Sequence, residues 1–287
     1  NKQSANASKV LGRVLNALAN DFDMKLSTLS GGLKDNAIPT DAEAVVIFSD
    51  TDMSDINTPG HADIPANSAH ASLQDLISKW NQIIRHECTH TDPDICITLE
   101  PVDLPTATMT DTSTHTVIDV LMTYPNGVRK MSKDIAGLVQ TSLNLGILST
   151  IKPDDQSTNG MVSFKSSVRS SIGSEKDALL NSLKSLATLA GGTLTVTGDY
   201  PAWEYREDSP LRDLMVKIFK QQYGKEPVIQ ALHAGVECGI FASKLPGLDC
   251  VSFGPDMDDI HTTNESMNVE SVRRTWKYTL KILKELK

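Results

Sequence analysis

The feature of the sequence that most constrains the fold is an order of helix-like and strand-like segments that occurs twice. Apolar residues at helical spacing predict a helix over residues 5–20. Strand-like runs follow over 24–32 and 42–50, then a second helix over 68–88 and a strand over 94–102. This α-β-β-α-β order lacks only a leading strand to form a ferredoxin-like unit.

A similar order follows. A helix is expected over 110–124, and paired strands are expected over 138–151 and 160–171. Ser174, with Asp177 three residues further on, has the pattern of a helix cap. The buried face of that helix is expected to hold Leu179, Leu183, Leu186 and Leu189. A strand over 191–200 completes the second α-β-β-α-β order, so the chain is expected to be an α/β protein.

The pattern changes near residue 203. Ser209 followed by Pro210 predicts a helix start, and Gly224 predicts its end. A helix-like segment over 236–247 precedes a compact, buried strand over 248–254. A last helix is expected over 269–286. Its inward face is expected to hold Val269, Val272, Trp276, Leu280 and Leu283. This alternation indicates part of an α/β layer structure.

The composition argues against several classes of partner and location. The formal net charge of −9 is unlike that of most nucleic-acid-binding proteins. No apolar run approaches the roughly 20 residues of a membrane helix, and no secretory signal pattern is visible. Four separated cysteines in 287 residues do not resemble a disulfide scaffold. They are expected to be reduced, in a cytoplasmic protein.

One short motif suggests metal chemistry. Residues 86–90 read "HECTH", in which His86 and His90 have zincin ligand spacing and Glu87 would be the base. The helix that would carry them is almost complete there, since "TDPD" follows. The alternative is a polar helix end whose imidazoles lie near the negative end of the helix dipole.

A second histidine lies in the loop "FGPDMDDIHTTNES", residues 253–266. His261 follows Asp256, Asp258 and Asp259, and Glu265 follows it. A neutral imidazole is a common zinc ligand, and a neighbouring acid can orient its second nitrogen. One histidine does not make a metal site, so other ligands would have to come from elsewhere.

A series of segments resembles one enzyme family. They are "GGLKDNAIPTDA", "YPNGVRKMS", "SSVRSSIGS", "GDYPAWEYREDSPL", "HAGVECGIF", "LPGLDCVSFGPDMDDIHTTNE" and "NVESVRRTW", in order along the whole chain. Together they resemble the aminoacyl-histidine (Xaa-His, carnosinase-like) dipeptidases of the two-metal aminopeptidase/carboxypeptidase superfamily. The resemblance implies a catalytic α/β domain that binds two Zn²⁺ ions, with Mn²⁺ or Co²⁺ as substitutes. A lid domain closes over a small, unblocked dipeptide.

The resemblance also implies how the chain is divided. Residues 1–203 resemble the lid, and 204–287 resemble the C-terminal part of the catalytic domain. The family's other metal ligands and its general-base glutamate have no match in these 287 residues. We therefore expect them in an N-terminal segment outside this sequence, and we expect this chain alone to be inactive. Lids of this superfamily often carry oligomer contacts, which makes a homodimer an expectation as well.

Individual residues take roles from the same resemblance. His261 matches a metal ligand. Arg169 matches a substrate-binding arginine, and its planar guanidinium suits a C-terminal carboxylate; the alternative is a surface arginine on an edge strand. Asn36 matches a residue that would donate to the substrate carbonyl or oxyanion, although an asparagine is also an ordinary turn residue. Asp35 departs from the more basic residue that the family pattern leads us to expect.

The segment "HAGVECG" is the last candidate. His233, Gly235 and Glu237 match residues that line the family's substrate pocket, whereas Glu237 alone could simply favour a helix N-terminus. The sequence leaves three alternative functions for the chain. The first is metal-dependent hydrolysis of Xaa-His dipeptides, the second a non-catalytic substrate-binding or dimerisation module, and the third a zincin built on the residue 86–90 motif.

Overall fold

The computed structural model describes residues 4–49, 69–151, 160–230, 237–260 and 262–287. The chain divides into two compact units. Unit 1 contains Asn1–Arg129, Ser142–Val168 and Leu179–Thr195; unit 2 contains Lys130–Thr141, Arg169–Ala178 and Val196–Lys287. Within the described residues, no helix is both long enough and apolar enough to cross a membrane.

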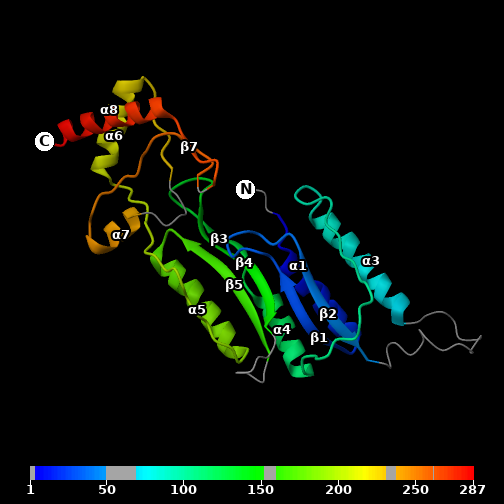
Figure 1. The fold of residues 1–287 in the computed structure, drawn as a ribbon. Helices are drawn as coiled ribbons and strands as arrows, with labels where there is room; N and C mark the ends of the chain where they lie inside the picture. The colour runs from blue at the N-terminus through cyan, green and yellow to red at the C-terminus, as the bar shows by residue number, and fades with distance from the viewer. Residues whose placement is uncertain (1–3, 50–68, 152–159, 231–236, 261) are drawn as a thin grey trace, which may run out of the picture. The chain divides into compact units, whose positions relative to one another are not determined.

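The order of helices and strands confirms an α/β fold (Figure 1). In chain order the elements are α1 (Ala7–Asp21), β1 (Met24–Gly31), β2 (Ala42–Phe48), α3 (Ala69–Glu87), α4 (Asp111–Thr123), β3 (Gly127–Met131), β4 (Val139–Ile151), β5 (Met161–Ser170), α5 (Gly173–Leu189), α6 (Pro210–Tyr223), α7 (Glu237–Lys244), β6 (Met257–Asp258), β7 (Ser266–Met267) and α8 (Val269–Glu285).

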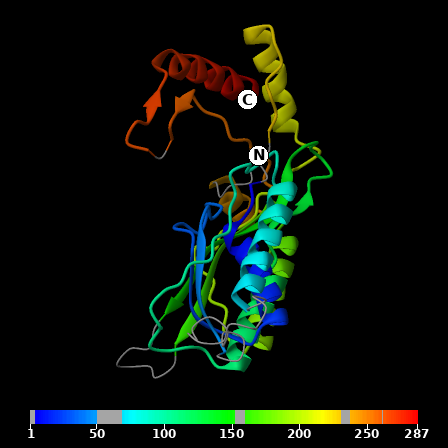
Figure 2. The same cartoon turned by 90° about the vertical axis from the view of Figure 1, so that its right-hand side faces the viewer.

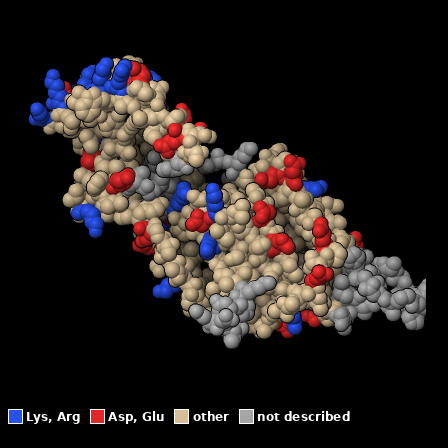
Figure 3. Space-filling view, in the orientation of Figure 1, with Lys and Arg blue, Asp and Glu red and all other residues tan. Residues whose placement is uncertain are grey.

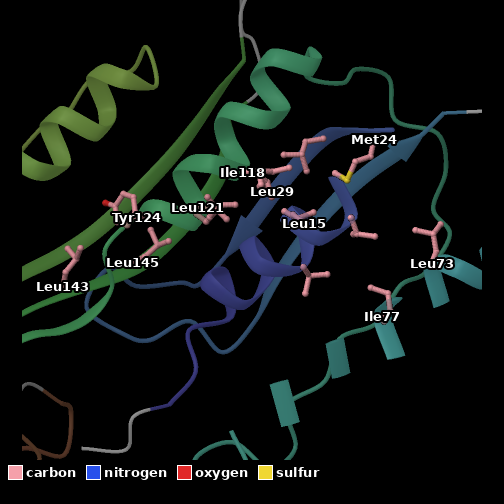
Figure 4. Close-up of a cluster of buried hydrophobic side chains, with 14 of the residues drawn as sticks. Leu15, Met24, Leu29, Leu73, Ile77, Ile118, Leu121, Tyr124, Leu143 and Leu145 are labelled. Atoms are coloured by element: carbon pink, nitrogen blue, oxygen red, sulfur yellow. The ribbon is translucent and has the colours of Figure 1, made fainter. Parts of the chain in front are cut away.

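A five-stranded sheet has the order β2-β1-β4-β3, with β5 also paired to β4. β1 pairs antiparallel with both β2 and β4. In unit 1, α1 and α3 lie together on one side of β1 and β2 (Figure 2). The buried cluster of unit 1 holds leucines from β1 and β4, such as Leu29 and Leu145, together with Leu15 of α1 and Leu121 of α4 (Figure 4). Burial of these side chains is the main term that stabilises unit 1.

Helices α1 and α4 pack closely because α1 has a glycine at the contact. A Cβ atom at Gly12 would lie 2.9 Å from the Cβ of Leu121. One turn earlier, Lys9 reaches the C-terminal end of α4, where the last carbonyl groups lack helical partners. Its Nζ donates to the carbonyl oxygens of Leu121, of Met122 at 3.2 Å and of Tyr124 at 2.8 Å. Burial lowers the pKa of Lys9 to about 8.

Unit 2 has a buried apolar cluster where α6 and α8 pack together. Met215 and Ile218 of α6 cluster with Tyr278 and Ile282 of α8, and the Tyr278 hydroxyl donates to the Met215 carbonyl at 2.7 Å. The predicted ends of α6 are confirmed. Ser209 caps the helix by accepting from the Arg212 amide, Pro210 is its first residue, and Gly224 has the left-handed φ of 68° that ends it.

Three predicted strands are wrong. The segments 94–102, 191–200 and 248–254 contain no strand. In the first, a side chain takes the place of a neighbouring strand. The Asn81 carboxamide donates to the Ile97 carbonyl at 2.7 Å and accepts from the Ile97 amide at 2.8 Å. Both backbone groups of Ile97 are thus satisfied without a strand partner.

Two predicted details of helices are also wrong. Ser174 does not cap α5, because it lies within the helix, which begins at Gly173. The Glu204 carboxylate accepts from the Gly173 amide at 3.2 Å. Leu189 at the end of α5 is 87% exposed. The face of α8 predicted to point inward is exposed, and the residues that α8 buries are Ser271, Tyr278 and Ile282.

Candidate functional site

The turn that carries Asn36 is fixed from both sides by backbone contacts within unit 1. It follows β1, and its first residue, Gly32, has a left-handed φ of 68°. A Cβ atom on Gly32 would lie 2.0 Å from the carbonyl oxygen of Gly146 in β4. A Cβ atom on Gly146 would lie 2.3 Å from the carbonyl oxygen of Asp35. The turn can lie this close to β4 only because both positions are glycine.

A single side chain binds the carbonyl groups of the two residues on either side of Asn36. The Nδ2 of Asn144 donates to the carbonyl oxygen of Asp35 at 3.1 Å and to that of Ala37 at 2.7 Å. Further along, the Ala7 amide donates to the carbonyl oxygen of the buried Pro39 at 3.1 Å. The turn is therefore a preorganised element rather than a freely moving loop.

The side chains of this turn point to solvent. Asn36 is exposed, and its carboxamide has no hydrogen-bond partner among the residues that the structure describes. Leu33 is 89% exposed although it lies on a fixed turn. A free amide donor on a rigid support can stabilise a developing negative charge on oxygen without reorganising. The geometry is thus compatible with the oxyanion role expected for Asn36.

Arg169 lies near the end of β5, where the strand is anchored by its next residues. Ser170 shares a hydrogen bond of 2.9 Å with the buried Thr141, and the Ser171 amide donates to the Gln140 carbonyl at 3.0 Å. The Arg169 side chain is half-buried. It has no ion-pair partner in the described part of the chain. An unneutralised guanidinium on a fixed strand suits a bound carboxylate.

The third candidate group is only partly described. His233 and Gly235 lie outside the described residues. Glu237 is the first residue of α7 and is exposed, so its carboxylate lies at the positive end of the helix dipole. Both expectations for Glu237, a pocket residue and a favourable helix start, remain open. α7 itself packs on 201–203, since a Cβ atom on Gly239 would lie 2.8 Å from the Pro201 carbonyl oxygen.

His261 also lies outside the described residues. β6 and β7 pair antiparallel and form a hairpin on either side of it. Asp259 has a φ of 51°, and its carbonyl oxygen accepts from the Thr262 amide at 3.1 Å and the Thr262 hydroxyl at 2.7 Å. Asp256 forms an ion pair with Arg274 at 2.8 Å. This hairpin was not predicted, because strands of two residues leave almost no alternation in a sequence.

The described residues do not by themselves form a metal site. They contain no group of three or more His, Cys, Asp or Glu side chains placed to hold an ion. The residue 86–90 motif does not adopt zincin geometry, since α3 ends at Glu87 and leaves His90 beyond the helix. Arg13 donates to both oxygens of Glu87, at 2.7 and 2.8 Å, and this contact lowers the pKa of Glu87. A carboxylate held in this way is a poor general base.

The candidate residues are divided between the two units. Asn36 belongs to unit 1, whereas Arg169 and Glu237 belong to unit 2. Unit 2 also contains an open hollow of about 1210 Å³, lined by aromatic and basic side chains such as Trp203, Tyr205, Arg212, Phe219 and Tyr278. Of the candidate residues that the structure describes, neither Asn36, Arg169 nor Glu237 lines it.

Sequence reasoning missed two residues that support the Asn36 turn. One of them had a recognisable signal, because Gly146 is an isolated glycine inside a strand pattern. Such a glycine often marks a close backbone approach. Asn144, two residues earlier, had no signal of its own. Its role depends on a turn more than a hundred positions away in the sequence.

All three comparisons with known proteins match this chain to peptidases. The model of "Peptidase family M20/M25/M40" matches residues 16–285. The chain is 32% identical over 281 residues, 98% of its length, to the cytosol non-specific dipeptidase of Escherichia coli K12, of which it covers 53%. It is similar to the crystal structure of an aminoacylhistidine dipeptidase from Vibrio alginolyticus, with a TM-score of 0.83 and 29% identity, over 98% of this chain and 52% of that one. The chain thus spans about half the length of these relatives.

Proposed function

Because the chain belongs to peptidase family M20/M25/M40, we propose that it forms part of a metal-dependent dipeptidase. In this proposal residues 1–203 are the lid and 204–287 are the C-terminal part of the catalytic domain. The likeness of nearly the whole chain to two dipeptidases is the observation that carries the proposal. The remaining metal ligands and the general base would come from an N-terminal segment outside these 287 residues.

The proposed substrate is an unblocked dipeptide of Xaa-His type, such as carnosine. One relative is named for aminoacylhistidine substrates, and the other is named non-specific. The preference for histidine is therefore proposed separately from the dipeptidase activity itself. Arg169 would bind the C-terminal carboxylate, and Asn36 would donate to the oxygen of the scissile carbonyl. His233, Gly235 and Glu237 would line the pocket.

His261 would be the one metal ligand that this chain contributes. The cofactor would be Zn²⁺, two ions per complete site, with Mn²⁺ or Co²⁺ able to replace it. Bound zinc lowers the pKa of a coordinated water and polarises a carbonyl group. The His261 imidazole is a suitable ligand because its neutral form offers a nitrogen lone pair.

We further propose a cytoplasmic location, as for the relative named a cytosol dipeptidase. No nucleic-acid or membrane partner is part of the proposal, and the net charge of −9 agrees with that. A homodimer formed through the lid is included, and light scattering of the purified protein would test it.

The test is a hybrid dipeptidase, in which this chain replaces its matched region in the E. coli enzyme. We expect it to release histidine from Xaa-His dipeptides when zinc is present. His261→Ala should abolish hydrolysis, whereas the control His115→Ala, at an exposed position of α4, should leave it unchanged. A folded hybrid that binds zinc but hydrolyses no dipeptide would favour the second candidate, a non-catalytic binding or dimerisation module. Faster hydrolysis of Xaa-Ala than of Xaa-His would refute the histidine preference alone.

A further inference from the structure

Two of the four cysteines lie close together in unit 2, where the chain turns after α7. Cys238 is the second residue of that helix, and Cys250 lies twelve positions further on. Between them the Leu248 amide donates to the Leu245 carbonyl at 3.0 Å, and Gly247 has a left-handed φ of 84°. The Cys238 thiol is in hydrogen-bonding contact with the Cys250 thiol. Two sulfurs in contact meet the first requirement for a disulfide bond, which is proximity.

The two thiols differ in how a reagent reaches them. Both are half-buried, and both are free. Cys250 is among the residues that line the hollow of unit 2, whereas Cys238 is not. Burial, together with the hydrogen bond to Cys250, raises the pKa of the Cys238 thiol to about 11. At neutral pH Cys238 is therefore protonated, and a reagent that enters the hollow contacts Cys250 first.

The charges around Cys250 favour a reagent that is an anion. Lysine and arginine gather over the end of unit 2 that α6 and α8 form (Figure 3), and both helices contribute to the lining of the hollow. Among the described residues that line the hollow, five are Lys or Arg and three are Asp or Glu. One of these cations, Arg206, donates to the Gly247 carbonyl at 2.7 Å, in the turn that precedes Cys250. An excess of positive charge raises the local concentration of small anions.

We propose that Cys238 and Cys250 form a redox-sensitive pair, which a small anionic disulfide such as glutathione disulfide oxidises to an intramolecular disulfide bond. The Cys250 thiolate attacks one sulfur of the reagent, whose S–S bond breaks, and the other half of the reagent leaves as a thiolate that takes up a proton. The Cys238 thiol then loses its proton, its sulfur attacks the Cys250 sulfur, and the second half of the reagent leaves. Two protein thiols are thus oxidised, and one disulfide is reduced to two thiols.

Oxidation would fasten the first turn of α7 to the segment 248–254. Glu237, the neighbour of Cys238, is one of the residues proposed to line the substrate pocket. The bond would therefore make the placement of a pocket residue depend on the surrounding redox conditions. A disulfide that forms and is reduced in this way is the kind found in reducing compartments, where such bonds are transient. The inference does not depend on the role of Glu237, because the bond is detected in the chain itself.

The test uses the purified 287-residue chain. The folded chain is treated with glutathione disulfide, the remaining thiols are alkylated, and the chain is digested with trypsin. Trypsin cleaves after Lys244, so Cys238 and Cys250 lie on different peptides that only a disulfide bond joins. We expect mass spectrometry to find these two peptides joined in most chains, with neither Cys88 nor Cys96 in a joined pair. Dithiothreitol should separate them again.

Two matched variants separate the roles of the two thiols. Cys238→Ser should stop at the mixed disulfide, so that glutathione remains on Cys250. Cys250→Ser should give no joined peptides. In that variant Cys238 should take up glutathione about tenfold more slowly than Cys250 does in Cys238→Ser, because a protonated thiol is a weak nucleophile. Equal rates in the two variants would contradict the order of attack.

Three other outcomes would overturn the pair itself. They are joined peptides that form only in urea, joined peptides that link two chains on a non-reducing gel, and joined peptides that contain Cys88 or Cys96 as often as Cys238. None of these measurements uses hydrolysis of a dipeptide. A failure of the proposed function would therefore leave the cysteine pair standing, and a failure of the pair would leave the proposed function standing.

Discussion

Gly32 and Gly146 approach so closely that a Cβ atom on the first would lie 2.0 Å from the carbonyl oxygen of the second. The contact joins the turn after β1 to the middle of β4, and Asn144 reinforces it with hydrogen bonds to the carbonyl groups on either side of Asn36. The position of Asn36 is therefore determined by two glycines and the side-chain amide of Asn144.

Replacing Gly146 by alanine should move the turn, because its new Cβ would collide with the backbone of Asp35. We expect a loss of about 1–3 kcal/mol in the free energy of unfolding of the chain, measured by urea denaturation. In the hybrid dipeptidase kcat should fall by up to about 100-fold, the scale of a displacement near 1 Å. Gly173→Ala is the control, since nothing lies within 4 Å of that position. Equal unfolding free energies for Gly146→Ala and Gly173→Ala would contradict the close approach of Gly146 to the backbone of Asp35.

The dependence of the unfolding free energy on pH should show that Lys9 is buried. Burial lowers its pKa from 10.5 to about 8, so between these values the unfolded chain binds more protons than the folded chain does. Stability contributed by this group should therefore rise with pH from about 8 to 10.5. The measurement is the difference in unfolding free energy between the unmodified chain and Lys9→Met, followed from pH 7 to 10.5. A difference that stays constant or falls over this range would show that Lys9 is not buried as described.

The residue 86–90 motif should have no catalytic role. Glu87→Gln removes one charge of an exposed ion pair with Arg13 and should cost no more than about 1 kcal/mol of stability. Hydrolysis by the hybrid dipeptidase should be unchanged in Glu87→Gln and in His86→Ala. Loss of bound zinc in His86→Ala would instead support the zincin alternative.

Arg169 should affect the binding of substrate rather than the chemical step. Arg169→Met in the hybrid should raise KM about 10- to 150-fold for dipeptides with a free C-terminus, the range for one lost charge-assisted hydrogen bond. For dipeptides with an amidated C-terminus the effect should disappear. Arg129→Met, at an exposed position of β3, is the matched control. An equal effect on both kinds of substrate would show that Arg169 does not recognise the carboxylate.

Local patterns in the sequence were enough for most helices but not for the sheet. The α6 boundaries followed from Ser209, Pro210 and Gly224, because cap chemistry depends only on neighbouring residues. Strand formation depends on a distant partner, and 94–102 failed as a strand because Asn81 satisfies its backbone. β3, with only five mostly exposed residues, gave no apolar alternation to recognise.

The candidate site was predicted by resemblance more than by pattern. Asn36, Arg169 and Glu237 were chosen because they match family positions, and the structure gives two of them a physical setting: a clamped turn and an anchored strand end. The apolar face of α8 that contains Trp276 was predicted to point inward, and that prediction was wrong because its side chains are exposed. An apolar pattern in a sequence shows which residues share a face, but it does not show whether that face is covered.

We propose that these 287 residues contribute His261 to a metal site whose other ligands lie outside them. The most direct test is to incubate the purified chain with Zn²⁺, Mn²⁺ or Co²⁺ and an Xaa-His dipeptide, and to measure free histidine. We predict none above background from the chain alone and steady release from the hybrid dipeptidase. Turnover by the chain alone that His261→Ala abolishes would contradict the claim.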